Sequence, residues 1–377
     1  MSKSRRMNGE GYIGFHKARG NFMAQVSHNG KRVTVYGKTK AIVAKKLKDL
    51  MRDADDGQDI TSTIKLVDFL NTFLRRRQNV VKPSTYLTYE RMIRNHIVPR
   101  LGGFKLTTID GDLVADTWTA MVEDGHSASV VEHCHAVLST ALNSAIPKYI
   151  KSNPCDEARR LKGVPKVAKK EVSVLSTEEQ VLILKEAKET TVFYPIIYTA
   201  LITGMRRGEL IGLQWRDIDF ENATIRVSRG AFQKDGKTIL ADPKTKGSKR
   251  AITIQSDEAE FLQDLFELQK GNALLNGYKV TEKSHVFVNL NTGKPFVTES
   301  VTQAFRRMTR RLGIDTAFHT LRHTHASMLL EMNVNPKIVS ERLGHSNIGI
   351  TMNLYSHLMP NTQRDALVGF KGKVPQV

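Results

Sequence analysis

The chain has 377 residues, of which 40% are hydrophobic and 25% are charged, a composition that is typical of folded globular proteins and excludes wholesale disorder. Its 57 Lys and Arg residues outnumber its 38 Asp and Glu residues, which gives a formal net charge of +19. No apolar run approaches the roughly 18 residues that a membrane span needs, and no apolar segment follows the basic N-terminus as it would in a secretory signal. The two cysteines, Cys134 and Cys155, exclude a disulfide framework and favour a reducing compartment.

The excess of basic residues is spread along the whole chain rather than confined to one tail. A protein that wraps a polyanion gains from phosphate contacts along its entire length. We therefore expect a nucleic-acid partner.

The first segment, residues 1–56, predicts a small sheet with one helix. Three β-prone runs, at 12–15, 22–26 and 33–36, are separated by turns, and a helix follows over about residues 40–51. Because a β-ribbon can enter the major groove of DNA, the basic residues of this sheet are candidate DNA contacts, with an ordinary solvated surface as the alternative. They are Lys17, Arg19, Lys31 and Arg32.

The second segment, residues 57–165, predicts an all-α bundle after an acidic linker at 53–62. Apolar residues at helical spacing predict three helices, over 66–74, from Pro83 to Ile97 and over 128–146. On the second of these helices, Arg91 and Arg94 lie away from the apolar side and are candidate DNA contacts. The basic stretch 151–170 contains two prolines and predicts a second linker that lies against phosphates.

The third segment, residues 166–377, predicts a mostly helical unit with a small antiparallel sheet. Ser176 to Glu179 form a capping box that opens a helix, and an apolar helix over 194–203 ends at Gly204. The other expected elements are strands over 223–228 and 250–254, a basic helix over 298–312, and helices over 320–331 and 336–343. Trp118, in the second segment, and Trp215, in the third, are expected to be core or interface residues.

Four stretches of the third segment hold the polar residues that suggest chemistry. They read TGMRRGEL over 203–210, PKTKGSKR over 243–250, HTLRH over 319–323, and LGH over 343–345 followed by TMNLYSH over 351–357. Together they supply two arginines, a lysine, two histidines and a tyrosine. Arginine forks bind phosphate oxygens, histidine moves protons near neutral pH, and tyrosine can form a covalent intermediate, so the set suits phosphoryl transfer without a metal.

A zinc site is the alternative for three histidines, because His319 and His323 lie one helical turn apart and His325 follows closely. No cysteine lies near them in the sequence, and phosphate binding accounts for the HTLR stretch. We therefore expect neither a metal ion nor a cofactor.

These four stretches resemble the motifs of the tyrosine recombinases, specifically the integrases of temperate phages and conjugative transposons. The family pattern is an Arg in a TGxRxGEL stretch, a Lys on a hairpin, HxLR, LGH and a late Tyr followed by x-His. The chain has TGMRRGEL, KTKGSKR, HTLR, LGH and NLYSH in the same order. The two N-terminal segments are similar, with less specific motifs, to the arm-site-binding and core-binding domains of the family.

The resemblance implies a role for each matched residue. Arg206 and Arg322 would bind the scissile phosphate, His319 would accept a proton, His345 would bind a phosphate oxygen, and Tyr355 would attack phosphorus.

The resemblance also implies a lysine that protonates the leaving 5′ oxygen. This lysine is Lys246, with Lys244 as the alternative because the hairpin varies in length within the family; Lys244 is otherwise a DNA contact. Arg207 falls on a variable position of the motif and is expected to be structural, and Glu209 is expected to hold the loop of Arg206.

The resemblance thus implies a multidomain, mostly α protein with small β-sheets: an arm-type DNA-binding domain over 1–56, a helical core-binding domain over 57–165, and an α+β catalytic domain with a C-terminal tail over 166–377. The expected function is site-specific integration and excision of a mobile element or prophage through a 3′-phosphotyrosyl intermediate. A catalytically silent DNA-binding relative and a type IB topoisomerase are the alternatives.

The expected partners are double-stranded attachment-site DNA of core and arm types, three further copies of the chain in a homotetramer on DNA, and an accessory DNA-bending or directionality factor. The expected location is the bacterial cytoplasm, at the nucleoid.

Overall fold

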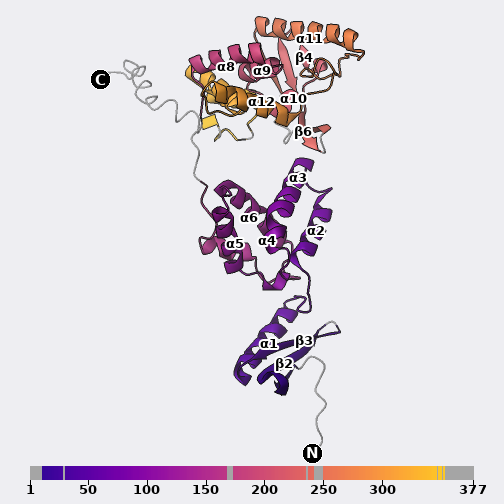
Figure 1. Ribbon diagram of the computed structural model, residues 1–377, viewed down its shortest axis with the longest axis vertical. Helices are drawn as coiled ribbons and strands as arrows, with labels where there is room; N and C mark the ends of the chain where they lie inside the picture. The colour runs from indigo at the N-terminus through magenta and orange to yellow at the C-terminus, as the bar shows by residue number, and fades with distance from the viewer. Residues whose placement is uncertain are drawn as a thin grey trace, which may run out of the picture. The chain divides into compact units, whose positions relative to one another are not determined.

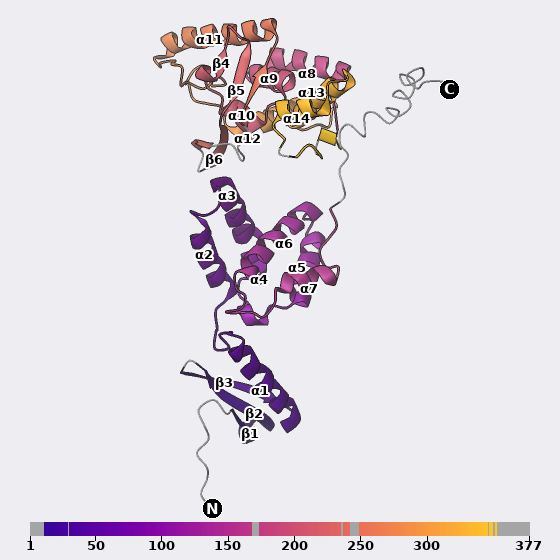
Figure 2. The ribbon, with the colours of Figure 1, turned by 180° about the vertical axis from the view of Figure 1, so that it is seen from behind.

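The computed structural model describes residues 11–28, 30–167, 173–234, 237–241, 249–345, 347–349 and 351–352. It divides into two compact units, residues 1–169 and 170–377 (Figures 1 and 2). Each unit has hydrophobic clusters of its own.

The first unit begins with a small antiparallel sheet of strand order β1-β2-β3, formed by β1 (Tyr12–His16), β2 (Asn21–His28) and β3 (Lys31–Gly37). Helix α1 (Lys40–Asp55) packs on one face of the sheet through Val43 and Leu47. The three predicted strands and the helix are confirmed, but the helix is longer than expected. Its last turn continues to Asp55 and is closed by a 2.8 Å hydrogen bond from the Asp56 amide to the Arg52 carbonyl, so the predicted linker at 53–62 was wrong at its start.

The rest of this unit is an all-α bundle, as predicted, built from α2 (Leu66–Arg77), α3 (Pro83–Met92), a π-helical turn η2 (Ile93–Ile97), α4 (Val98–Leu101), α5 (Gly111–Glu123), α6 (Ala128–Asn143) and α7 (Pro154–Arg160). Trp118 of α5 is fully buried and donates its indole N–H to Nδ1 of His135 at 3.1 Å. Its expected place in the core is therefore confirmed.

Three helices of the bundle were not expected: the short α4, which directly follows η2, and helices α5 and α7. In α5, Asp110 accepts a hydrogen bond from the Leu113 amide at 2.9 Å and so caps the helix. Helix α7 lies inside the stretch that was predicted to be a second linker, and this prediction was wrong. Asn153 caps it, and Cys155 and Ala158 are buried against α5 and α6, because the prolines and charges of the stretch are also those of a short helix whose N-terminus starts with Pro.

The second unit holds a three-stranded antiparallel sheet of order β4-β5-β8 and a separate hairpin of β6 and β7. The strands are β4 (Ile218–Asp219), β5 (Thr224–Val227), β6 (Gly230–Lys234), β7 (Lys237–Ala241) and β8 (Arg250–Thr253). The helices are α8 (Thr177–Thr190), α9 (Tyr194–Thr203), α10 (Arg207–Ile211), α11 (Ser256–Asn276), α12 (Thr298–Arg311), α13 (Thr320–Glu331) and α14 (Pro336–Leu343). The expected elements of this segment are confirmed; β4, the hairpin β6–β7 and α11 were not predicted.

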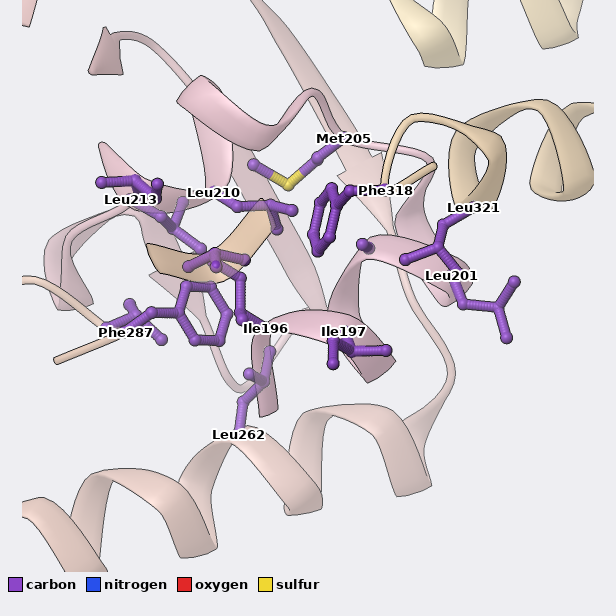
Figure 3. Packing of buried hydrophobic residues seen from close by; sticks show 14 of the residues in the cluster. Ile196, Ile197, Leu201, Met205, Leu210, Leu213, Leu262, Phe287, Phe318 and Leu321 are labelled. Carbon is purple, nitrogen blue, oxygen red and sulfur yellow. The ribbon is translucent and has the colours of Figure 1, made fainter. Parts of the chain in front are cut away.

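Helix α9 is the central element of this unit. Its sequence is apolar on every side, as expected of a helix that is surrounded by other elements, and Ile196, Ile197 and Leu201 are buried. Figure 3 shows these side chains among Leu262 from α11, Phe287, Phe318 and Leu321. The end of α9 is therefore held rigidly, and this is where the first of the polar motifs begins. Trp215 is buried nearby, 3% exposed, and donates to Oε1 of Gln269 at 2.6 Å.

No helix in the described part of the chain is long and apolar enough to cross a membrane.

Candidate active site

The described residues of the polar motifs meet at the turn that ends α9. Gly204 has a φ of 63° and closes the helix with a hydrogen bond from its amide to the Ala200 carbonyl. A Cβ at this position would lie 2.5 Å from Cδ2 of Leu343 and 2.7 Å from Cδ2 of His325. Glycine is required here both by the left-handed backbone and by the lack of space. The turn consequently brings Arg206, at the start of α10, close to the end of α14.

Arg206 is held from two sides. Its Nη1 donates to Oε1 of Glu209 at 2.9 Å, its backbone amide donates to Oε2 of the same carboxylate at 2.9 Å, and its Nη2 donates to the Gly344 carbonyl at 2.9 Å. Glu209 therefore holds the loop of Arg206, as expected. Burial acts to raise the pKa of Glu209, but hydrogen bonds and charges from Arg250 and Arg206 outweigh it and hold this pKa below its usual value.

Arg322, in the first turn of α13, is the most buried cation of the site, at 3% exposure. Its Nη1 donates to the Gly204 carbonyl and its Nη2 to the Leu343 carbonyl, both at 2.7 Å. Among the described residues, no carboxylate lies within ion-pair distance of its guanidinium, so its charge is oriented but not neutralised. Burial and the neighbouring charge of Arg206 lower the pKa of Arg322 to about 9, which still leaves it charged at neutral pH.

His319 lies immediately before α13, and its ring meets that of His323 edge to face with centroids 4.8 Å apart. The residue as a whole is exposed. Desolvation of its imidazole by the surrounding protein, then the charges of His323, Arg322 and Arg206, lower the pKa of His319 to about 4. Its imidazole is therefore neutral at pH 7 and can accept a proton.

His345 follows Gly344, which ends α14 with a φ of 66°. Its Nδ1 lies 2.8 Å from Oγ1 of Thr351. Burial, then the charges of Arg322 and Arg206, lower the pKa of His345 to about 4. Because the same two arginines act on both histidines, all four side chains share one electrostatic field. An anion bound in that field would raise both histidine pKa values.

The third histidine of the possible zinc set lies elsewhere. His325 is buried, its Nδ1 lies 2.9 Å from the Leu201 carbonyl, and its Nε2 accepts a hydrogen bond from Nε of Arg342 at 3.1 Å. Within the ranges that the structure describes, no three His, Cys, Asp or Glu side chains are grouped so that they could hold a metal ion.

The sequence did not predict a role for two arginines of the site, Arg250 and Arg342. Arg250 binds Glu209, and Arg342 donates to Thr253 and Ile202 carbonyls at 2.7 and 3.4 Å as well as to His325. A signal for Arg250 was available in the sequence, because residues two apart on a strand share a face and Ile252 is a core residue. Nothing comparable marks Arg342, whose partners lie far away in the sequence.

Three expected site residues, Lys244, Lys246 and Tyr355, lie outside the described residues. Arg207, which was expected to be structural, is half-buried and donates from Nη1 to Oγ1 of Thr302 on α12. This contact with α12 fits the expected structural role.

The candidate DNA contacts in the first unit are all exposed. Lys17 and Arg19 lie in the short turn between β1 and β2, where Cζ of Arg19 is 4.7 Å from the centre of the Tyr36 ring. The others are Lys31 and Arg32, at the start of β3, Arg91, near the end of α3, and Arg94, in η2.

Comparison with family models gives two matches. Residues 173–362 match the phage integrase family, and residues 65–114 match the phage integrase N-terminal SAM-like domain. The chain is 31% identical over 359 residues to a tyrosine recombinase XerC-like protein of Caldanaerobacter subterraneus, and the aligned region covers 90% of this chain and 92% of that protein. It is 27% identical over 291 residues to the ICEBs1 integrase of Bacillus subtilis, which covers 75% of this chain and 76% of the relative.

Solved structures with a similar fold include two integrase–DNA complexes. The Tn1549 transposon integrase in complex with transposon right end DNA has a TM-score of 0.69 and 26% identity, and the match covers 82% of this chain and 100% of that one. The lambda integrase tetramer bound to a Holliday junction has a TM-score of 0.57 at 20% identity, over 93% of this chain and 96% of that one. The second likeness concerns the fold alone.

Proposed function

The chain belongs to the phage integrase family and is a DNA-binding, site-specific tyrosine recombinase; we propose that it cuts and rejoins attachment-site DNA with the side chains gathered around Gly204. The observation that carries this proposal is Arg322. Arg322 is 3% exposed as a residue, and among the described residues its guanidinium is oriented only by carbonyl oxygens. A buried cation without a carboxylate partner is suited to bind an anion that comes from a ligand. Three of its five N–H donors remain for phosphate oxygens.

In the proposed reaction the phenolic oxygen of Tyr355 attacks the scissile phosphorus and His319 takes the phenol proton. The bond from phosphorus to the 5′ oxygen breaks, and Lys246, or alternatively Lys244, gives that oxygen a proton. The products are a 3′-phosphotyrosyl bond and a free 5′ hydroxyl. Because one phosphodiester replaces another, the energy of the broken bond is kept, and a second DNA strand can reverse the step without ATP or a metal.

The cations of the site act mainly on the transition state of this reaction. The pentacoordinate phosphorus carries more negative charge on its equatorial oxygens than the diester does. Arg206 and Arg322 are held by the Gly344 and Leu343 carbonyls, and their charges act on His345, which supports a preset cluster of donors. Donors that are preset before the charge develops stabilise the transition state selectively.

We further propose three functional domains: an arm-site-binding domain over 1–56, a core-binding domain over 57–165 and a catalytic domain over 166–377. The sheet with α1 and the helical bundle have separate hydrophobic clusters, which supports the first boundary. The lambda integrase structure is a tetramer on a Holliday junction, and we propose that four copies of this chain assemble likewise on two duplexes. Regulation by an accessory DNA-bending or directionality factor, and action at the bacterial nucleoid in the cytoplasm, complete the proposal.

Covalent trapping tests the mechanism. The protein is mixed, without metal or ATP, with a nicked attachment-site duplex that loses its 5′ hydroxyl fragment on cleavage, and a denaturing gel is run beside a Tyr355→Phe control. A protease-sensitive protein–DNA band that is absent in the control is the expected result. Tight binding without a band would instead favour the DNA-binding relative, and relaxation of plasmids without site preference would favour the topoisomerase.

A further inference from the structure

Arg250 lies where three parts of the candidate site meet, although none of the roles proposed above belongs to it. It begins β8, directly after the stretch that carries Lys244 and Lys246. Its side chain is 6% exposed. Its guanidinium contacts Glu209 on α10, and its Nε donates to the Arg342 carbonyl at 2.5 Å in the last turn of α14.

We propose that Arg250 is a positioning residue for the reaction: it sets the guanidinium of Arg206 through Glu209, and it sets the turn that carries His345 through the carbonyl of Arg342. This inference rests on the proposed function, in which Arg206 and His345 bind the scissile phosphate.

The carboxylate of Glu209 transmits the first effect. Its Oε1 accepts from Nη1 of Arg206 at 2.9 Å and from Nη1 of Arg250 at 3.2 Å. Its Oε2 accepts from the Arg206 amide and from Nη2 of Arg250, both at 2.9 Å. The two-pronged contact with Arg250 fixes the plane of the carboxylate, and that plane fixes where Nη1 of Arg206 lies. A lysine is a single point charge and cannot reproduce this geometry.

The contact between Arg250 and Glu209 also has an electrostatic effect on Arg206. Glu209 is buried, and its carboxylate directly contacts Arg206, which is proposed to bind the phosphate. Arg250 neutralises this carboxylate, so that the positive charge of Arg206 is left for the phosphate. Without Arg250, Arg206 would be the remaining ion-pair partner of a buried carboxylate among the described residues, and the pair would oppose the approach of a phosphate.

The turn at the end of α14 transmits the effect of Arg250 on His345. A Cβ on Gly344 would lie 3.1 Å from Nη1 of Arg250, so the guanidinium packs directly against this turn. The carbonyls of Leu343 and Gly344 in the same turn accept the hydrogen bonds of Arg322 and Arg206. A shift of the turn would therefore move the acceptors of both phosphate-binding arginines and His345 together.

The test compares Arg250→Met, Arg250→Lys and a matched control, Arg226→Met. Arg226 belongs to β5, pairs with Ala251 in the same sheet and forms an ion pair with Asp219 at 3.4 Å, but its side chain is 66% exposed. The full-length protein is saturated with nicked attachment-site duplex, and the single-turnover rate of covalent trapping is measured, together with the Kd for DNA and the Tm.

We expect Arg250→Met to trap about 100-fold more slowly, Arg250→Lys about 10-fold more slowly, and Arg226→Met within about 2-fold of the unaltered protein, with Kd values within about 3-fold. Should Arg250→Met fold poorly, Arg250→Lys carries the test. Trapping by Arg250→Lys at the unaltered rate would overturn the proposal.

Two further measurements separate positioning from a general effect on the fold. A substrate with a methyl group in place of one non-bridging oxygen of the scissile phosphate carries one charge less, so the deficit of Arg250→Met should shrink to about 10-fold or below. A deficit that is equal on both substrates contradicts the proposal.

In an Arg206→Ala background, Arg250→Met should slow trapping by about 10-fold instead of about 100-fold, because the effect through Glu209 has lost its target and only the effect through the α14 turn remains. A loss of about 100-fold in both backgrounds would refute the positioning of Arg206 by Arg250 and leave the proposed function intact. If Arg206→Ala alone traps at the unaltered rate, the role of Arg206 in the proposed function is wrong, and the positioning role falls with it.

Discussion

Acidification should destabilise the catalytic unit through His325. Its Nε2 accepts from Arg342 and its Nδ1 faces the Leu201 carbonyl, so the folded protein requires a neutral imidazole with its proton on Nδ1. Protonation would turn Nε2 into a donor that faces a guanidinium. Burial, then Arg342, lower the pKa of His325 to about 4.

The sign and size of the effect follow from linkage. The ordinary histidine pKa of about 6.5 applies to the unfolded chain, which therefore binds more protons than the folded protein between about pH 6.5 and 4. The stability is fully present above about pH 6.5 and is lost as the pH falls through this window. For a folded pKa of about 4, His325 accounts for a loss of about 2 kcal/mol between pH 7.5 and pH 5.

The two tryptophans make the measurement possible, because Trp118 lies in the first unit and Trp215 in the second. In a Trp118→Phe background, urea unfolding followed by fluorescence reports the second unit alone. His325→Gln keeps a donor and an acceptor but does not titrate. It should lose about 2 kcal/mol less than the parent between pH 7.5 and pH 5, whereas His133→Gln, at an exposed position in the other unit, should leave the loss unchanged. Equal losses in His325→Gln and its parent would show that this histidine is not the source.

Three other outcomes are expected. Gly204→Ala should lower the free energy of unfolding in urea by about 2 to 4 kcal/mol, because the new Cβ meets a left-handed backbone and contacts below 3 Å. Gly313→Ala should lower it by about 1 kcal/mol, because Gly313 has a φ of 72° but nothing within 4 Å. Equal losses would show that the close contacts at Gly204 do not matter. Arg322→Met should raise the pKa of His345 in the DNA-free protein, because the positive charge of Arg322 helps to lower that pKa, and Arg322→Lys should raise it less. NMR titration measures both changes, and an unchanged pKa in Arg322→Met would contradict the shared field. Removal of residues 1–56 should abolish protection of a distal site in footprinting and spare trapping on a core site, and loss of both would contradict a separate arm-binding domain.

The helices around the site could be predicted because their ends are set by local signals. Gly204 and Gly344 adopt the left-handed conformation that ends α9 and α14, and Pro336 begins α14. The resemblance to the tyrosine recombinases implied which side chains would lie together, and the charges of Arg206 and Arg322 do act on His345.

The unpredicted parts depend on partners that are distant in the sequence. The sequence around Arg342 shows only a helix residue, and its hydrogen bonds to the Thr253 and Ile202 carbonyls become visible only in the folded structure. Helix α7 was missed because a proline and paired charges in a short stretch fit a linker as well as a helix, and only the burial of Cys155 and Ala158 decides between them.

Backbone carbonyls provide most of the contacts that orient Arg206 and Arg322, the arginines that we propose to bind the phosphate, and this has a chemical consequence. Carboxylates in the positions of the Gly204, Leu343 and Gly344 carbonyls would hold Arg322 and Arg206 at least as firmly, but each would cancel a positive charge. Carbonyl dipoles fix the direction of each guanidinium group and leave its positive charge in place. Glu209 is the carboxylate that contacts Arg206 among the described residues, and Arg250 offsets its charge. Burial and the field that remains lower the pKa values of His319 and His345 before DNA arrives. In the proposed mechanism, a neutral general base is therefore ready when the phosphate binds.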